Sequence, residues 1–244
     1  MVLIYGDARK METNVNETTW KPRFVQLDQN FLKWIKKFNY QLNVIYDIGA
    51  SNGSWSVQMN EILPESQFIL FEPLANSDEY SEILADRLQK HSNFMLEKVA
   101  LGNQNGEITV NIMPNIVAST TLKYWTDKQK TVKLYTVNNL IVESKLPTPN
   151  MIKIDTQGSE LAILQGATNI LPEVDFLLLE CWLMKGYGKN TPLLSDIIDF
   201  LLEFNFSLFE LTGCYRNEEG VLAHQDCIFI NTKRSLLPAH YYAS

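Results

Sequence analysis

From residue 43 onward, short apolar runs alternate with segments whose apolar residues recur every three or four positions. The apolar runs are residues 44–48, 68–71, 94–101, 151–155 and 176–180, and helical spacing covers residues 55–63, 80–88, 159–170 and 194–201. Strands that are apolar on both faces and alternate with amphipathic helices are typical of a mostly parallel sheet with helices on both faces. This alternation therefore predicts an α/β fold.

Two stretches of the chain depart from that alternation. Residues 107–112 and 131–137 are strand-like runs separated by a polar loop, which predicts a small β insertion. The last two runs, 206–211 and 227–230, are joined by a segment that is too polar and too rich in turn residues for a crossover helix. We therefore expect them to form an antiparallel hairpin at the end of the sheet.

The N-terminal part predicts a helix that precedes the first strand. Apolar residues stand at positions i, i+3, i+4 and i+7, namely Phe31, Trp34, Ile35 and Phe38. Asp28 is placed to cap this helix. No motif lies there, so we expect it to cover the sheet edge or the substrate mouth. The expected organisation is an N-terminal arm and helix over 1–40, a main domain over 41–235 and a tail over 236–244.

Charge and composition exclude several classes of protein. The chain of 244 residues has 28 acidic and 21 basic side chains, a net charge of -7, which argues against a nucleic-acid partner. The three cysteines form no metal or redox motif and are typical of a cytosolic protein. The most apolar stretch, 174–184, contains two acids and is too short to span a bilayer. We therefore expect a cytoplasmic protein without a membrane partner.

Acidic residues end four of the predicted strands. They are Asp47, Glu72, Asp155 and Glu180. Each of them alone could be a helix cap or a turn residue. In open α/β sheets, however, ligands bind outside the carboxyl ends of the strands. Four acids at four strand ends therefore predict one acidic rim around a ligand site.

The turn after the first strand narrows the choice of ligand. Its glycines, Gly49 and Gly53, have GxxxG spacing and no following lysine, so they match neither a Walker phosphate loop nor the GxGxxG fingerprint of nicotinamide enzymes. Asp47 would repel a pyrophosphate and suits a cationic ligand. Glu72 is placed to accept hydrogen bonds from a ribose diol. S-adenosylmethionine, a cationic nucleoside without phosphate, has these properties. A nicotinamide-dependent oxidoreductase is the disfavoured alternative.

Several segments resemble one family. Residues 44–53, Val-Ile-Tyr-Asp-Ile-Gly-Ala-Ser-Asn-Gly, resemble motif I of the FkbM family of S-adenosylmethionine-dependent methyltransferases. Further segments similar to that family are 71–73 (Phe-Glu-Pro), 99–102 (Val-Ala-Leu-Gly), 119–122 (Ser-Thr-Thr-Leu), 136–140 (Thr-Val-Asn-Asn-Leu), 153–160 (Lys-Ile-Asp-Thr-Gln-Gly-Ser-Glu) and 164–167 (Leu-Gln-Gly-Ala). The resemblance covers about residues 43–180 and fades toward residue 230.

The resemblance implies a class I methyltransferase fold, which is Rossmann-like, with a mostly parallel seven-stranded sheet and an antiparallel last strand. It also implies methyl transfer, most often to a hydroxyl oxygen of a sugar or secondary metabolite. The cofactor-binding residues that we expect are Asp47, Gly49, Ala50, Asn52, Gly53, Glu72, Pro73, Val99, Ala100 and Asp155. Two departures stand out: Gln157 replaces a glutamate, and Asn138–Asn139 replaces a pair of aspartates.

Transfer to an aliphatic hydroxyl also needs a general base. The candidates are Asp155, Glu180 and His224, and Asp226 could orient the histidine. We expect no metal, because the only short spacing of ligand residues is at a strand start. The loop 185–192 has the composition of a substrate loop. The expected partner is a hydroxylated small molecule or a glycan, and a homo-oligomer is possible. A non-catalytic subunit that binds S-adenosylmethionine is the remaining alternative.

Overall fold

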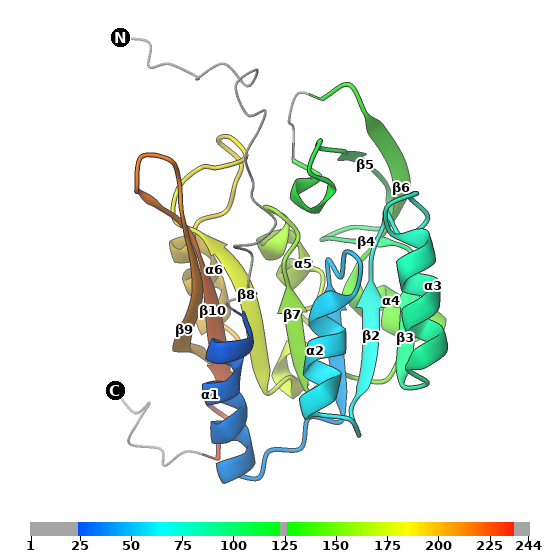
Figure 1. Cartoon of the computed structure of the whole chain (residues 1–244). Coiled ribbons are helices and arrows are strands. Elements are labelled where there is room, and N and C mark those ends of the chain that lie inside the picture. The colour runs from blue at the N-terminus through cyan, green and yellow to red at the C-terminus, as the bar shows by residue number, and fades with distance from the viewer. Residues whose placement is uncertain (1–23, 123–125, 237–244) are drawn as a thin grey trace.

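The computed structural model describes residues 24–122 and 126–236 and is built around a seven-stranded sheet with the strand order β3-β2-β1-β7-β8-β10-β9 (Figure 1). The strands are β1 Val44–Ile48, β2 Gln67–Phe71, β3 Phe94–Glu97, β7 Met151–Ile154, β8 Phe176–Trp182, β9 Phe206–Arg216 and β10 Leu222–Asn231. Strands β3, β2, β1, β7 and β8 pair in parallel, and β10 is antiparallel to both of its neighbours. The predicted sheet, with an antiparallel last strand, is confirmed.

Helices cover both faces of this sheet. They are α1 Phe24–Lys37, α2 Ser54–Ile62 and α3 Ser81–Lys90 on one face, and α4 Val137–Ser144, α5 Glu160–Gln165 and α6 Leu194–Leu202 on the other (Figure 1). Successive strand residues point to opposite faces. Ile45 accordingly belongs to the apolar cluster under α1, α2 and α3, and Tyr46 to the cluster under α4, α5 and α6. No helix in these ranges is both long and apolar enough to cross a membrane.

A second, three-stranded sheet forms the predicted β insertion. Its strands are β4 Ala100–Leu101, β5 Gly106–Asn111 and β6 Gln129–Tyr135, in the order β4-β6-β5. A short 3-10 helix, Ile116–Ala118, belongs to the same insertion. In Figure 1 this sheet stands above the carboxyl ends of β1 and β2. The insertion therefore lies over the edge of the main sheet at which a ligand site was predicted.

One predicted strand, 94–101, is wrong as a single element. The chain forms β3 in the main sheet and then, after Lys98 and Val99, forms β4 in the small sheet beside β6. An apolar run shows that a segment is buried, but it does not show where the segment changes partner. A helix in 137–144 was also missed. Thr136 caps this helix, α4, by accepting a hydrogen bond from the backbone N of Asn139.

Helix α1 packs on the sheet far from the carboxyl ends of the strands. The ring of Phe31 lies 5.1 Å from that of Phe176, the first residue of β8, and the ring of Trp34 lies 4.6 Å from that of Phe209 on the edge strand β9. The helix thus covers the sheet near its edge and not the substrate mouth. It begins at Phe24, so Asp28 lies inside the helix and is not its cap. Residues 1–23 of the predicted arm and 237–244 of the tail lie outside the described residues.

Two element boundaries also differ from the prediction. Helix α5 ends at Gln165, five residues earlier than expected, and the chain turns into a 3-10 helix at Leu171–Glu173. The hairpin strands β9 and β10 extend through most of the polar segment that was predicted as their connection. Their polar residues pair in the ladder and with one another. The side chain of Gln225, for example, donates to the carbonyl of Gly213.

Candidate active site

Two of the predicted acids lie side by side, one directly after β7 and the other near the carboxyl end of β8. Ile154 pairs with Leu179, so Asp155, the next residue, comes beside Glu180. Glu180 does not end its strand, as the sequence predicted, because β8 continues to Trp182. On the other side of β8, Asp226 of β10 pairs directly with Glu180. Three carboxyl groups from three neighbouring strands therefore meet on one edge of the sheet.

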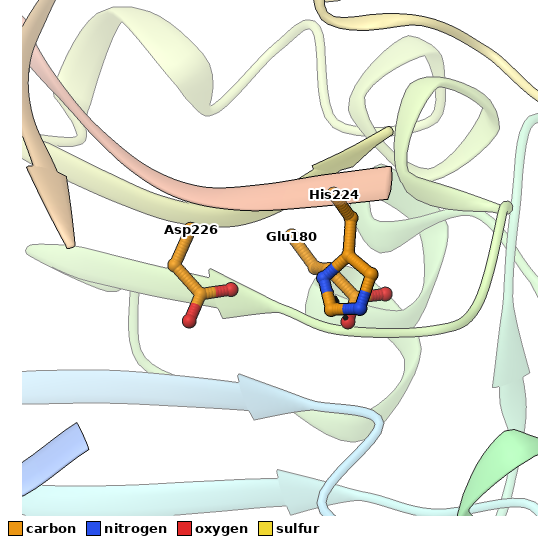
Figure 2. Close-up of side chains that lie close together, drawn as sticks. All are labelled: Glu180, His224 and Asp226. Atoms are coloured by element: carbon orange, nitrogen blue, oxygen red, sulfur yellow. Dashed lines mark ion pairs between the residues drawn. The ribbon is translucent and has the colours of Figure 1, made fainter. Parts of the chain in front are cut away.

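The imidazole of His224 lies against this group of acids (Figure 2). Its Nδ1 atom is 3.1 Å from Oε1 of Glu180. The ring is stacked on Tyr215 with centroids 5.0 Å apart, and the ring of Trp182 lies at the same distance. Burial lowers the pKa of His224, which the charge of Asp155 opposes. The sequence did not pair His224 with Glu180, because their contact depends on the register of β10 against β8.

The side chain of Gln157 joins two of the candidate bases. Its Nε2 atom donates to Oδ1 of Asp155 and to Oε2 of Glu180, both at 3.0 Å, and its Oε1 accepts from the hydroxyl of Tyr187 at 2.7 Å. Burial raises the pKa of Glu180 well above its ordinary value, and the charges of Asp155, Glu160 and Asp226 raise it further. The amide of Gln157 favours the ionised form and opposes this rise.

The loop 156–159 that carries Gln157 is held from two sides. The buried carboxylate of Glu160 accepts from the backbone N of Thr156 at 3.0 Å and from that of Gly158 at 3.0 and 3.1 Å. Burial raises the pKa of Glu160 to about 7, although these backbone hydrogen bonds favour the ionised form. From the insertion, the hydroxyl of Thr120 donates to the carbonyl of Gln157 at 2.7 Å. The Ser-Thr-Thr-Leu motif therefore helps to fix this loop.

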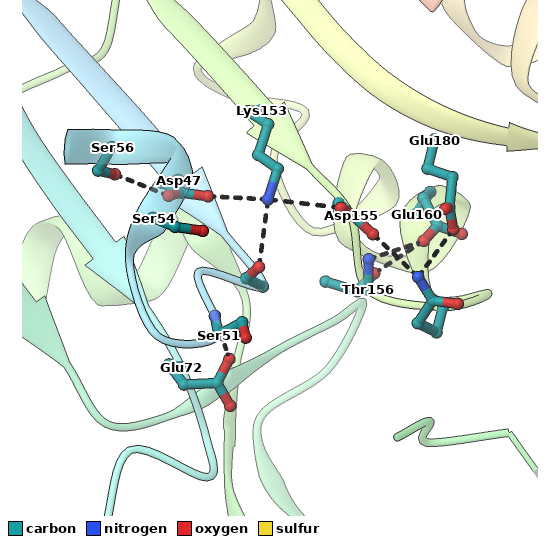
Figure 3. A network of polar contacts seen from close by, with 12 residues as sticks. Asp47, Ser51, Ser54, Ser56, Glu72, Lys153, Asp155, Thr156, Glu160 and Glu180 are labelled. Carbon is teal, nitrogen blue, oxygen red and sulfur yellow. Dashed lines mark hydrogen bonds and ion pairs between the residues drawn. The ribbon is translucent and has the colours of Figure 1, made fainter. Parts of the chain in front are cut away.

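A buried ion pair joins the ends of β1 and β7 (Figure 3). The Nζ atom of Lys153 lies 3.0 Å from Oδ1 of Asp47, 3.2 Å from the carbonyl of Gly49 and 3.7 Å from Oδ2 of Asp155. The second oxygen of Asp47 accepts from Ser56 at 2.7 Å. Burial alone would lower the pKa of Lys153, but Asp47 and Asp155 outweigh it and the pKa is raised. The positive charge that the sequence led us to expect from a ligand beside Asp47 is thus present in the protein itself.

The carboxylate of Glu72 receives backbone hydrogen bonds on both oxygens. Ser51 N donates to Oε2 at 2.7 Å, and Leu74 N donates to Oε1 at 2.8 Å. Burial raises the pKa of Glu72 to about 7, although both backbone bonds favour the ionised form. The turn beside it depends on Gly49, which has φ +75° and whose added Cβ would lie 2.0 Å from the carbonyl oxygen of Asp155. The turn and the carboxylate are thus fixed to each other.

An open cavity lies between the carboxyl ends of these strands and the insertion. Of the residues expected to bind the cofactor, those that line it are Gly49, Glu72, Pro73, Val99, Ala100 and Asp155. Those outside its lining are Asp47, Ala50, Asn52 and Gly53, and of the candidate bases Glu180 and His224. Asn52 turns away, since its side-chain oxygen accepts from Arg87 at 3.0 Å. Gly53 caps the N-terminus of α2 with φ +80°.

The sequence missed several polar residues in the cavity wall. They include Ser51, Tyr80, Thr121 and Ser159. The hydroxyl of Tyr80 accepts from that of Ser51 at 2.9 Å, and burial raises the pKa of Tyr80 to about 12. In the sequence, Tyr80 was an apolar position of a helical pattern, so no local signal marked its hydroxyl. Thr121 did have one, because it lies in the Ser-Thr-Thr-Leu motif.

Residues 47–208 match the methyltransferase FkbM domain family. The chain belongs to the FkbM methyltransferase family. It is also 24% identical over 222 residues to the hexuronic acid methyltransferase AglP of Haloferax volcanii, covering 91% of this chain and 87% of that protein. The FkbM methyltransferase of Methylobacillus flagellatus has a similar structure, with a TM-score of 0.51 and 16% identity over 78% of this chain. The chain spans 43% of the length of that solved protein.

These comparisons confirm three expectations: membership of the FkbM family, a class I methyltransferase fold, and an enzyme that transfers methyl groups. The likeness to the solved structure shows the fold alone, because the identity is low. The mostly parallel seven-stranded sheet, with the last strand β10 antiparallel, is the arrangement that the family resemblance implied. Ligands of this fold bind at the carboxyl ends of the strands. The residues at these ends include Gly49, Glu72 and Asp155.

The two departures from the FkbM pattern lie in different surroundings. Asn138 is at the start of α4, where its side-chain oxygen accepts from Asn169 N at 3.1 Å and its backbone N donates to the carbonyl of Gly166 at 3.0 Å. It does not line the cavity. Gln157 does line the cavity and contacts two candidate bases. The first departure therefore concerns packing of a helix, and the second concerns the site.

Proposed function

We propose that this methyltransferase uses S-adenosylmethionine to methylate a hydroxyl oxygen of a sugar in a glycan that contains a hexuronic acid. The observation that carries the proposal is that one cavity has the buried carboxylate of Glu72 in one part of its wall and Asp155 in another. The first suits a ribose, and the second lies beside the candidate bases. The name of the Haloferax relative, a hexuronic acid methyltransferase, supports a hexuronic acid as part of the acceptor.

The cavity wall fits S-adenosylmethionine better than a dinucleotide. In the described chain, no lysine, arginine or histidine lines the cavity, so a pyrophosphate would lack a cationic partner. In our proposal Glu72 accepts the ribose hydroxyls, since each carboxylate oxygen keeps a free lone pair beside its backbone bond. Pro73, Val99 and Ala100 would border the adenine, and Gly49 would let the ligand approach the backbone. The cofactor supplies a methyl group that is already activated by a sulfonium.

Asp155 and its neighbours would then serve the acceptor. The acceptor oxygen forms a bond to the methyl carbon as the carbon–sulfur bond breaks, and the hydroxyl proton must pass to a base. Asp155 lies in the cavity wall, so we propose it as the group nearest the transferred methyl. Glu180 lies one strand further along the sheet, on β8, and His224 lies two strands further, on β10. Gln157 joins Glu180 to Asp155, and His224 lies against Glu180. They are the candidates to take the proton.

The surroundings of His224 favour a sugar as the acceptor. Trp182 and Tyr215 place aromatic rings on either side of the imidazole, and Tyr187, from the predicted substrate loop, packs edge-on against Trp182 at 5.1 Å. Aromatic walls with a few hydrogen-bonding groups are typical of sites for small organic ligands. A sugar ring has apolar C–H faces and hydroxyl edges, and so it matches both kinds of group.

The test is transfer of labelled methyl from S-adenosylmethionine to a panel of uronic-acid glycans, neutral sugars, amines and RNA. We expect an alkali-stable methyl ether on the uronic-acid glycan, and its loss in Glu72→Ala. Glu61→Ala, an exposed acid on α2, is the matched control and should keep full activity. Methylation confined to amines or RNA would contradict the proposal. Binding of S-adenosylhomocysteine without transfer to any acceptor would favour the non-catalytic alternative.

A further inference from the structure

Three residues on β8 and β10 bring metal-binding atoms together outside the cavity wall. Glu180, His224 and Asp226 each offer one ligand atom, and these atoms all lie within 4.8 Å of one another. His224 and Asp226 are two apart on β10, so they point to the same face, and Asp226 pairs with Glu180 across the ladder. Figure 2 shows the three side chains converging on that face. The regular geometry of two paired strands therefore holds this group in place.

The spacing of these atoms suits a single small cation. Nitrogen and carboxylate ligands lie about 2.0–2.2 Å from a divalent metal such as zinc, so two ligands of one ion are separated by up to roughly 4.2 Å. Atoms spread over 4.8 Å reach that geometry with small side-chain rotations. Two of the three residues, Glu180 and Asp226, are each only 8% exposed. The group is thus shielded from water on most sides.

One ring nitrogen of His224 is not satisfied by a hydrogen bond from the described residues. His224 Nδ1 is buried and, within the described residues, makes no hydrogen bond, although it lies 3.1 Å from Oε1 of Glu180. The other oxygen of Glu180 accepts from Gln157, which orients the carboxylate so that Oε1 faces the imidazole. Buried polar atoms are normally paired, so a buried ring nitrogen aimed at a carboxylate without a hydrogen bond points to a missing partner.

The charges around the group favour a cation as that partner. Asp155 and Asp226 lie on the two strands that flank Glu180, and Glu160 is a third acid near it. Lys153, the buried cation nearby, is already held by Asp47 and Asp155. A divalent cation would offset the excess of negative charge on these strands.

We propose that Glu180, His224 and Asp226 bind one divalent cation of the Mn²⁺ or Zn²⁺ type. Two carboxylates and one imidazole are ligands that suit these ions, whereas a site of oxygen ligands alone would suit Mg²⁺ or Ca²⁺ better. The stacking of His224 on Tyr215 fixes the plane of the ring. Glu180 is 44 residues before His224 in the chain and meets it only in the sheet, so the spacing of ligand residues in the sequence does not predict this group.

Such a cation would also bear on the acceptor, a consequence that rests on the proposed function. The group of acids formed by Asp155, Glu180 and Asp226 would repel the carboxylate of a hexuronic acid. A divalent cation on Glu180, His224 and Asp226 reverses the local charge and can coordinate a carboxylate or a hydroxyl. With the cation bound, Asp155 is the candidate base that is not a metal ligand. The site would then select acidic sugars. Binding of the cation itself does not depend on the cofactor or on the acceptor.

The test is a titration of the chelator-treated full chain with Mn²⁺, followed by the electron paramagnetic resonance signal of free Mn²⁺, with Zn²⁺ as a competitor. We expect one Mn²⁺ per chain, displaced by Zn²⁺. Affinity should fall at least about tenfold in His224→Gln and in Asp226→Asn, as expected for loss of a ligand. The controls are His91→Gln, a histidine at the end of α3, and Asp175→Asn, a carboxylate of similar burial at 9%. Both should bind Mn²⁺ as the unsubstituted chain does.

Failure of the metal site is distinguishable from failure of the proposed function. No binding of Mn²⁺ or Zn²⁺ by the unsubstituted chain, or unchanged affinity in both ligand variants, would overturn the site. Thermal unfolding of each variant shows whether it folds, and His224→Gln carries the test if Asp226→Asn does not, because the His224 side chain is 21% exposed. Tight Mn²⁺ binding without any methyl transfer would support the cation site and contradict only the function.

Discussion

The Nζ atom of Lys153 lies 3.0 Å from Oδ1 of Asp47, and neither side chain is exposed by more than 7%. The two residues are 106 positions apart and fasten β1 to β7 at the carboxyl edge of the sheet. Removal of one partner of a buried pair leaves an uncompensated charge, which costs about 3–5 kcal/mol. We therefore expect Lys153→Met to lower the free energy of unfolding by that amount in a denaturant titration.

The matched control for this prediction is Lys90→Met. Lys90 and Asp86 form an ion pair at 2.8 Å, but their side chains are 66% and 53% exposed. Exposed pairs at this helical spacing contribute about 0.3–0.5 kcal/mol. If Lys153→Met costs no more than Lys90→Met, the ion pair with Asp47 does not hold the two strands together.

Crowding, rather than backbone strain, should make Gly49 irreplaceable. Gly49 and Gly220 both have positive φ, +75° and +80°, but an added Cβ at Gly49 would lie 2.0 Å from the carbonyl oxygen of Asp155, whereas at Gly220 it would meet nothing within 4 Å. Positive φ costs a non-glycine residue roughly 1–3 kcal/mol in either place. We expect Gly220→Ala to lose only that amount and Gly49→Ala to lose more, together with binding of S-adenosylhomocysteine. Equal unfolding energies for the two variants would contradict this account of the turn.

Gln157 should act through the two carboxylates that it contacts. Gln157→Met keeps the length of the side chain but removes hydrogen bonds to Asp155 and Glu180, each worth about 1.5–3 kcal/mol when the partner is charged. We expect kcat to fall by roughly ten- to a hundredfold with little change in the affinity for S-adenosylhomocysteine. Gln165→Met, an exposed position at the end of α5, should leave both unchanged. An equal loss of cofactor affinity and kcat in Gln157→Met would show a general structural role instead.

Cofactor affinity should depend on pH through Glu72. Burial raises the pKa of Glu72 to about 7 in the free protein, and the ionised form is the one that accepts hydrogen bonds from a ribose. Affinity for S-adenosylhomocysteine should therefore rise as the pH rises through about 7, and below that value it should fall by up to roughly tenfold per pH unit. In calorimetry, Glu72→Gln should bind more weakly and lose this dependence. A pH profile that is the same in both proteins would assign the titration to another group.

The raised pKa of Glu72 affects folding in the opposite direction: it makes stability fall, not rise, as the pH increases. A carboxyl group whose pKa is higher in the folded protein than in the unfolded chain binds more protons when folded. Its contribution to stability is complete below its ordinary pKa of about 4.5 and is lost as the pH rises through about 7. For the free protein, Glu72→Gln should remove this part of the decline in the free energy of unfolding.

The order of elements was readable from the sequence because it depends on local periodicity. Apolar runs such as 44–48 and helical spacing such as 194–201 correspond to β1 and α6, and strand-end residues such as Asp155 could be placed at the ligand edge of the sheet. The break between β3 and β4 could not be read, since both halves are equally apolar. Pairs that form across the sheet, such as Lys153 with Asp47, also leave no local pattern.

For the same reason the sequence could identify acidic residues at strand ends but could not predict the role of each one. Asp47 and Glu72 looked alike as acids at strand ends, yet one is held by a lysine and the other lines the cavity. His224 could not be joined to Glu180 without the register of β10. The expected domain limits, a cytoplasmic location, a homo-oligomer, a role in secondary metabolism and the lack of a nucleic-acid partner stay predictions.

The most direct test of the account is the position of the new methyl group on the acceptor. The purified chain would be incubated with S-adenosylmethionine carrying a ¹³C-labelled methyl group and a glycan that contains a hexuronic acid, and the product would be examined by nuclear magnetic resonance. The account predicts one labelled methyl group, bonded to a ring hydroxyl oxygen as an ether, and none with Glu72→Ala. A label on nitrogen, or a label transferred equally well by Glu72→Ala, would contradict it.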